Sequence, residues 1–107
     1  MIRSALMAIP DGGLYELAPP DGPPTSVYQY LYGEQSNPLV GLSWVSGDVD
    51  AWTELGFAAS GEPTSHFDAV PPGVTNYPSG QAEDTSVTWW ARHVRAGQYS
   101  AWAEAAG

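Results

Sequence analysis

Three residue types that together support hydrolysis, a serine, a histidine and an aspartate, occur close together as Ser65, His66 and Asp68. In a hydrolytic triad, a histidine oriented by an aspartate removes the proton from the serine hydroxyl, which then attacks the substrate. Triad members normally come from separate elements and work beside a preformed oxyanion site, whereas these three share one Pro-flanked loop. The sequence also has no nucleophile elbow. We therefore expect a polar loop here and predict that the protein is not an enzyme.

Metal binding is the second chemistry to consider. Asp48 and Asp50 flank Val49 in the segment 47–50, and oxygen-rich turns can hold Ca²⁺. The spacing of an EF-hand loop is missing, and two histidines without a cysteine do not make a zinc site. We expect a solvated turn, with no metal and no cofactor.

The densest stretch is VTWWARHVRAGQYSAWAEA, residues 87–105, which holds three of the five tryptophans. His93 stands between Arg92 and Arg95, whose positive charges would lower its pKa, so we expect a packed or surface side chain rather than a base. At least one of the two arginines should pair with a carboxylate or stack on a tryptophan face. These structural roles explain both arginines without an anionic substrate.

Composition excludes several classes of partner. The net charge is −9, no lysine is present and twelve residues are acidic, so the chain cannot form the basic face that nucleic-acid binding requires. No apolar run approaches the length of a membrane span, and the run near the start is too short for a typical signal peptide. We predict no nucleic-acid partner, no membrane partner and synthesis in the cytoplasm. The 107 residues, with no cysteine, predict one domain without disulfides.

Short strands separated by turns dominate the pattern of the chain. The predicted strands lie at 25–34, 39–45, 51–60, 66–70, 74–77, 87–94 and 99–105. Residues 78–86 are expected to form a loop. This spacing predicts an all-β fold, a β-sandwich of about seven short antiparallel strands.

The Pro/Gly segment PPDGPP, residues 19–24, cannot join the centre of a sheet. It divides the chain into an N-terminal arm or extra strands at residues 1–18 and a sandwich domain at residues 19–107. The arm could form two short strands or lie on a neighbouring molecule.

Aromatic pairs and triplets in the strands leave two alternatives open. Trp89 and Trp90 are adjacent, so one faces the core and the other faces outward, to meet a loop, the arm or a partner. We take Trp89 as the candidate contact. Tyr28, Tyr30 and Tyr32 share one face of the first strand, which is either the sandwich interior or an exposed strip that contacts a partner or a glycan.

Two segments resemble a fibronectin type III domain. LVGLSWVSGDVDAW is similar to the second strand of that family and the start of the third, which implies that Trp44 and Trp52 belong to the core. WWARHVRAGQYSAWAE is similar to the last hairpin of the family, which implies that Trp90, Val94 and Trp102 hold this hairpin to the core. The resemblance covers about residues 20–106 and implies a fibronectin type III-like (Ig-like) sandwich.

The resemblance departs from the family at the last hairpin. Trp90 stands where the family usually has a tyrosine, and strict alternation from an inward Trp90 would point Arg92 into the core as well. We therefore expect a bulge or a shifted register in this strand.

Small, acidic, lysine-free β-proteins rich in tryptophan, glycine and proline resemble accessory virion proteins of tailed bacteriophages, in which such sandwiches recur. The resemblance implies a non-enzymatic structural protein of the virion. The leading hypothesis is a capsid decoration (cement) protein that binds the protein lattice of the virion through its N-terminal arm and sandwich surface. A minor tail protein and a carbohydrate-binding module with exposed Tyr and Trp are the alternatives. The implied partners are major capsid or tail proteins, further copies of the chain, or surface glycans.

Overall fold

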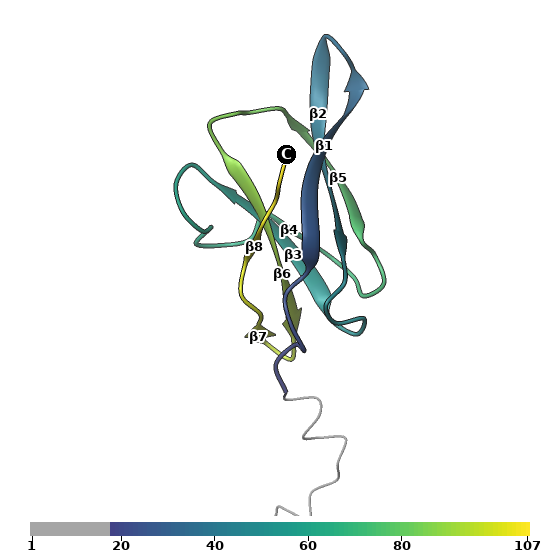
Figure 1. Cartoon of the computed structure of the whole chain (residues 1–107), viewed down its shortest axis with the longest axis vertical. Coiled ribbons are helices and arrows are strands. Elements are labelled where there is room, and N and C mark those ends of the chain that lie inside the picture. Colours follow the sequence, from purple (N-terminus) through teal and green to yellow (C-terminus); the bar gives the residue numbers. More distant parts are fainter. Residues whose placement is uncertain (1–17) are drawn as a thin grey trace, which may run out of the picture.

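The computed structural model of the protein describes residues 18–107, and every regular element in this part of the chain is a β-strand (Figure 1). The strands are β1 (Thr25–Glu34), β2 (Asn37–Val45), β3 (Trp52–Ala58), β4 (Asp68–Val70), β5 (Asn76–Ala82), β6 (Thr88–Arg95), β7 (Gln98–Tyr99) and β8 (Ala103–Glu104). The predicted all-β class is confirmed. Residues 1–17 lie outside the described residues, so the N-terminal arm stays a prediction.

The strands form two antiparallel sheets that pack face to face as a sandwich (Figure 1). The first sheet has the order β1-β2-β5. The second has the order β4-β3-β6-β7, and β8 also pairs with β6. The chain therefore crosses between the sheets after β2, after β4 and after β5.

The core lies between the sheets and comes from alternate residues of their central strands. Val40, Leu42 and Trp44 on β2 are buried in one cluster with Leu55 on β3 and Trp89 on β6. Successive strand residues point to opposite faces, so every second residue of these strands enters the core. The predicted core position of Trp44 is confirmed, because its side chain is 4% exposed.

The C-terminal residues join the two sheets along one edge of the sandwich. The Ala105 N–H donates to the Trp89 carbonyl at 2.9 Å in the second sheet. The next residue turns to the first sheet, where the Ala106 N–H donates to the Val27 carbonyl at 2.9 Å and the Ala106 carbonyl accepts from Gln29 at 2.8 Å. This seam supplies partners to part of the β1 edge, which would otherwise be open.

The strand predictions hold except in the middle and at the end of the chain, where the strand predicted at 99–105 is divided into β7 and β8. β1 occupies the predicted range, and β2, β3 and β6 differ from the predictions only at their ends. The loop predicted at 78–86 is wrong in its first part, because β5 continues to Ala82. β5 tolerates Pro78 because it is an edge strand with a register shift beside this residue.

The predicted directions of Trp89 and Trp90 are reversed in the structure. Trp89 is 3% exposed in the core, and Trp90 lies on the outer face of the second sheet. The register between β3 and β6 is continuous from Trp52 to Ala58, so the predicted bulge is also wrong. Arg92 determines this arrangement, because its charge faces outward toward Glu54, and alternation then turns Trp89 inward.

Three further residues predicted as core lie on the same outer face. Trp52 is 48% exposed, and Val94, its partner in the register, is half-buried. Trp102 is also half-buried and packs over Arg92. Each alternates with a residue that enters the core, such as Thr53 beside Trp52. The resemblance placed Trp44 correctly in the core, whereas it placed Trp52 and Trp90 in the right strands but on the wrong face.

Replacing the two tryptophans separately tests this correction. Trp89→Ala should lower the free energy of unfolding by about 3–5 kcal/mol, because it empties a site in the core. Trp52→Ala should lower it by about 1 kcal/mol or less, because that side chain is half exposed. Urea unfolding followed by circular dichroism measures both values. Equal losses, or a larger loss for Trp52→Ala, would contradict the structure.

Candidate functional site

Aromatic side chains gather around one ion pair on the outer face of the second sheet. Cross-strand neighbours in the register form the rows Trp52 with Val94, Glu54 with Arg92, and Gly56 with Trp90. Beyond β6, Tyr99 pairs with Val94, and Trp102 follows in the chain before β8. We call this surface the outer aromatic face; it comprises Trp52, Glu54, Trp90, Arg92, Tyr99 and Trp102.

Arg92 is the centre of the outer aromatic face. Its Nε donates to the Glu54 Oε1 at 2.8 Å. Its guanidinium lies 3.8 Å from the centroid of the Tyr99 ring and 4.3 Å from that of the Trp102 ring. The planar cation is therefore held by a carboxylate and two aromatic faces, which leaves it little freedom to lose on binding. The predicted pairing and stacking of an arginine are confirmed.

Glu54 is buried although it points outward from its strand. It is 7% exposed, and Arg92 and the His66 ring, whose Nδ1 lies 3.5 Å from the Glu54 Oε2, pack against its carboxylate. The loop between β3 and β4 lies over the same face, and a Cβ at Gly56 would meet Pro63 and the Ser65 carbonyl. Glu54 is not among the residues singled out from the sequence, although it is the single charged residue of β3.

Within the described part of the chain, no hydrogen bond joins Ser65, His66 and Asp68, the three residues of the possible triad. His66 lies against Glu54, whereas Asp68 accepts from the Tyr77 hydroxyl at 2.9 Å and from the Ala69 N–H at 2.8 Å. Ser65 lines an open hollow of about 200 Å³ with His66 and two phenylalanines. The arrangement is that of a polar loop beside a hydrophobic edge.

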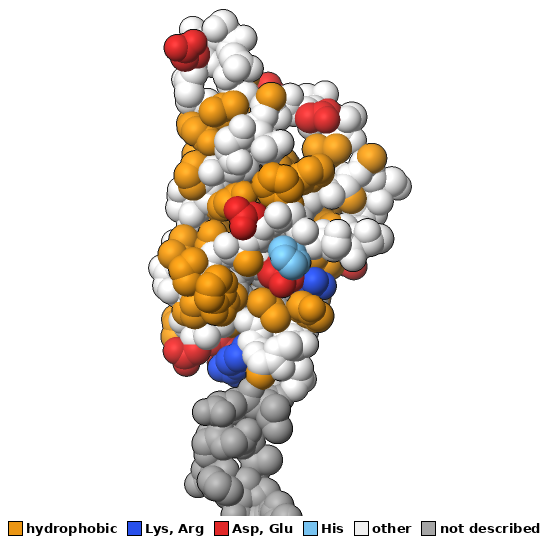
Figure 2. Space-filling model, turned by 180° about the vertical axis from the view of Figure 1, so that it is seen from behind, with side chains coloured by type: hydrophobic (Ala, Val, Ile, Leu, Met, Phe, Trp, Pro, Cys, Tyr) orange, Lys and Arg blue, Asp and Glu red, His pale blue; other side chains and the backbone are white. Residues whose placement is uncertain are grey.

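Three rings pack at that edge of the sandwich. Phe57 lies 4.8 Å from Trp89 and 5.4 Å from Phe67 between ring centroids. Phe57 and Phe67 stay 38% and 44% exposed. In Figure 2 hydrophobic side chains cover much of the visible surface. Neither phenylalanine is among the residues singled out from the sequence.

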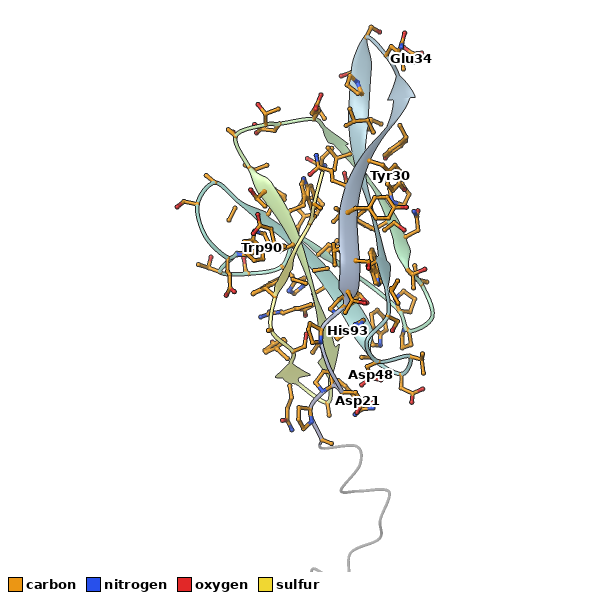
Figure 3. The ribbon with its side chains drawn as sticks, viewed as in Figure 1. Asp21, Tyr30, Glu34, Asp48, Trp90 and His93 are labelled. Carbon is orange, nitrogen blue, oxygen red and sulfur yellow. The ribbon has the colours of Figure 1, made fainter. Side chains whose placement is uncertain are left out.

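His93 is a buried structural hub at the other end of the second sheet (Figure 3). The Gly47 N–H donates to its Nε2 at 3.0 Å, so the neutral ring carries its proton on Nδ1. That nitrogen lies 3.0 Å from the Thr53 hydroxyl and 3.2 Å from the Trp52 carbonyl, to which it donates. Burial lowers the pKa of His93, whereas like-charge repulsion was the expected cause.

Asp48 fixes the loop beside this hub through its carboxylate oxygens (Figure 3). Oδ1 accepts from the Asp50 N–H at 2.9 Å, and Oδ2 accepts from the Asp21 N–H at 3.0 Å and lies 3.3 Å from Arg95. Burial raises the pKa of Asp48, but these N–H groups and the arginine outweigh it and hold this pKa below its ordinary range. The solvated turn expected here is therefore wrong for Asp48, which is 4% exposed.

The tyrosine triplet occupies the outer face of the first sheet. Tyr28, Tyr30 and Tyr32 share that face, while Val27 points into the core. Of the two alternatives, the interior is excluded, because Tyr28 is 50% exposed and the other two are half-buried. The sandwich thus carries aromatic residues on both outer faces.

Within residues 18–107, no three His, Cys, Asp or Glu side chains gather in a way that could hold a metal ion. The same part of the chain has no helix with the length and apolar character needed to span a membrane.

Comparison with protein-family models, curated proteins and solved structures gives no match for this chain.

The burial of His93 predicts that the stability of the protein depends on pH. Because burial lowers the pKa of His93, the unfolded chain binds a proton on this residue at a higher pH than the folded chain. The buried, neutral His93 ring contributes fully to the free energy of unfolding above the ordinary histidine pKa of about 6.5. Below that pH this free energy falls by at most about 1.4 kcal/mol per pH unit.

Urea unfolding at several pH values between 5 and 8 measures this effect. His93→Gln should remove the histidine-dependent slope, whereas the exposed His66 provides the control, and His66→Gln should retain it. Parallel pH profiles for the wild type and His93→Gln would contradict the assignment.

Proposed function

We propose that the protein is a non-enzymatic structural protein of a bacteriophage virion, a capsid decoration protein that docks on the protein lattice through its outer aromatic face. The observation that carries the docking step is the fixed position of Arg92 between Glu54, Tyr99 and Trp102. The predicted arm at residues 1–18 would add a second contact with the lattice.

The composition of the outer aromatic face favours a protein partner. Trp, Tyr and Arg are the residues that most often dominate the binding energy of protein interfaces. Trp52 is 48% exposed and Tyr99 is 54% exposed, so both could be covered on docking. Their positions on paired strands keep them in place before a partner arrives, which reduces the entropy lost on binding.

The electrostatics of this face are also compatible with burial in an interface. A charge taken out of water is costly unless it is paired. Arg92 and Glu54 already form a hydrogen-bonded pair, so a partner surface could cover them without leaving either charge alone. The overall charge of −9 favours a neutral or basic lattice.

A fibronectin type III-like identity of the sandwich belongs to the same proposal. The first, second and fifth strands form one sheet, and the third, fourth and sixth strands, with the short final ones, form the other. Division of consecutive antiparallel strands between two packed sheets is the arrangement shared by the immunoglobulin and fibronectin type III sandwiches. This topology supports the likeness seen in the sequence.

Binding to capsids tests the proposal. The protein is mixed with capsids assembled from the major capsid protein encoded in the same genome, and bound protein is measured after sedimentation. The wild type should bind at a fixed ratio to the capsid protein. The double variant Trp52→Ala/Tyr99→Ala should bind at least about tenfold more weakly, because two exposed aromatic contacts are lost.

Tyr28→Ala is the matched control, because this side chain is 50% exposed on the opposite sheet. It should bind capsids as the wild type does. Failure of the wild type to sediment with capsids would reject the decoration role, and recovery with isolated tails would replace it with a tail role. Equal weakening by Tyr28→Ala would reject the assignment of the docking face.

A further inference from the structure

The outer face of the first sheet carries a row of three aromatic rings, which we call the tyrosine face. Tyr28, Tyr30 and Tyr32 occupy alternate positions of β1. The ring centroids of Tyr28 and Tyr30 are 6.4 Å apart, and those of Tyr30 and Tyr32 are 6.1 Å apart. Figure 3 shows Tyr30 on the side of β1 that faces away from the second sheet. The three rings form a continuous row along the strand.

Tyr30 lies across the sheet rather than projecting into solvent. Its hydroxyl reaches past β2 to β5 and donates to the Asn76 Oδ1 at 3.0 Å. Gly41 on β2 makes room beneath the ring, because a Cβ at this position would overlap the ring carbons of Tyr30. Because Gly41 has no side chain, one face of the Tyr30 ring packs against the sheet and the other face points outward.

Tyr32 is fixed in a similar way. Its hydroxyl accepts from the Gly80 N–H at 2.8 Å, on the same edge strand that anchors Tyr30. The two hydroxyls therefore differ in the hydrogen bond that each can still make with a ligand. The Tyr30 oxygen keeps a lone pair that can accept, and the Tyr32 hydroxyl keeps its proton for donation. Sugar hydroxyl groups, which both donate and accept, could use either.

The tyrosine face is almost free of charge although the chain is strongly acidic. β1, β2 and β5 contain a single charged residue, Glu34, which lies at the tip of the β1-β2 hairpin (Figure 3). The residues that share the face on β2 and β5 include Ser43, Asn76 and Pro78. Such a surface offers no charge for an ionic ligand, and its rings and hydrogen-bonding groups suit a neutral one.

We propose that the tyrosine face binds a neutral polysaccharide chain, with successive sugar rings stacked on the three tyrosines. Aromatic rings present an apolar surface with a negatively polarised face, which attracts the C–H groups on the flat side of a pyranose ring. Adjacent rings are tilted by 55° and 50°, so the row follows a twisted path. A soluble, twisted chain therefore fits this row better than a flat crystalline surface. This inference does not depend on the virion proposal.

Affinity electrophoresis in gels that contain soluble neutral polysaccharides tests the inference. The panel comprises β-glucan, glucomannan, galactomannan, xylan and a dextran, with alginate as an acidic comparison. At least one neutral polysaccharide should retard the wild-type protein. Tyr28→Ala and Tyr30→Ala should weaken this retardation by tenfold or more, and Tyr30→Phe, which keeps the ring but loses its hydroxyl anchor, should weaken it less.

Tyr99→Ala is the matched control, because Tyr99 is 54% exposed on the other sheet, and it should bind as the wild type does. Circular dichroism confirms that each variant is folded; if Tyr30→Ala does not fold, Tyr28→Ala decides the outcome, because Tyr28 is half exposed. Absence of retardation by every neutral polysaccharide, retardation by alginate alone, or equal loss in Tyr99→Ala would overturn the inference.

Discussion

The ion pair between Arg92 and Glu54 determines which way the side chains of the β3-β6 pair point. β6 is a central strand, and a guanidinium turned between the sheets would have to leave water without a partner. A shift of one residue along either strand would exchange its two faces. In the observed register Glu54 lies opposite Arg92, and Trp89, Ala91 and His93 on the other face of β6 are buried. One polar contact outside the core thereby supports the core itself.

The two outer faces of the sandwich have different chemistry, and the difference follows from how each sheet places its aromatic residues. On the second sheet the aromatic rings surround a charged pair, which suits a partner that can cover polar and apolar groups together. On the first sheet Tyr30 and Tyr32 are fixed by hydrogen bonds to the edge strand, and charge is nearly absent. A module with such faces could hold two ligands at once, because neither surface overlaps the other.

The sequence predicted the strands better than it predicted their faces. Alternation located β1 and the central strands because half-buried strands follow a period of two. The charge of Arg92 predicts the observed sides of Trp89 and Trp90 by alternation along the strand, whereas the family resemblance predicts the reverse. The contact of Glu54 with Arg92 and His66 could not be read from the sequence, since it depends on the register and on the path of a loop.

The seam formed by residues 105–106 has a consequence for biosynthesis. The hydrogen bonds that these residues make to Trp89 and Val27 link the two sheets, and they can form only after this part of the chain has left the ribosome. Until then the edge of β1 remains open to other strands, including those of neighbouring nascent chains. Formation of this seam therefore closes part of a strand edge that would otherwise be open to aggregation.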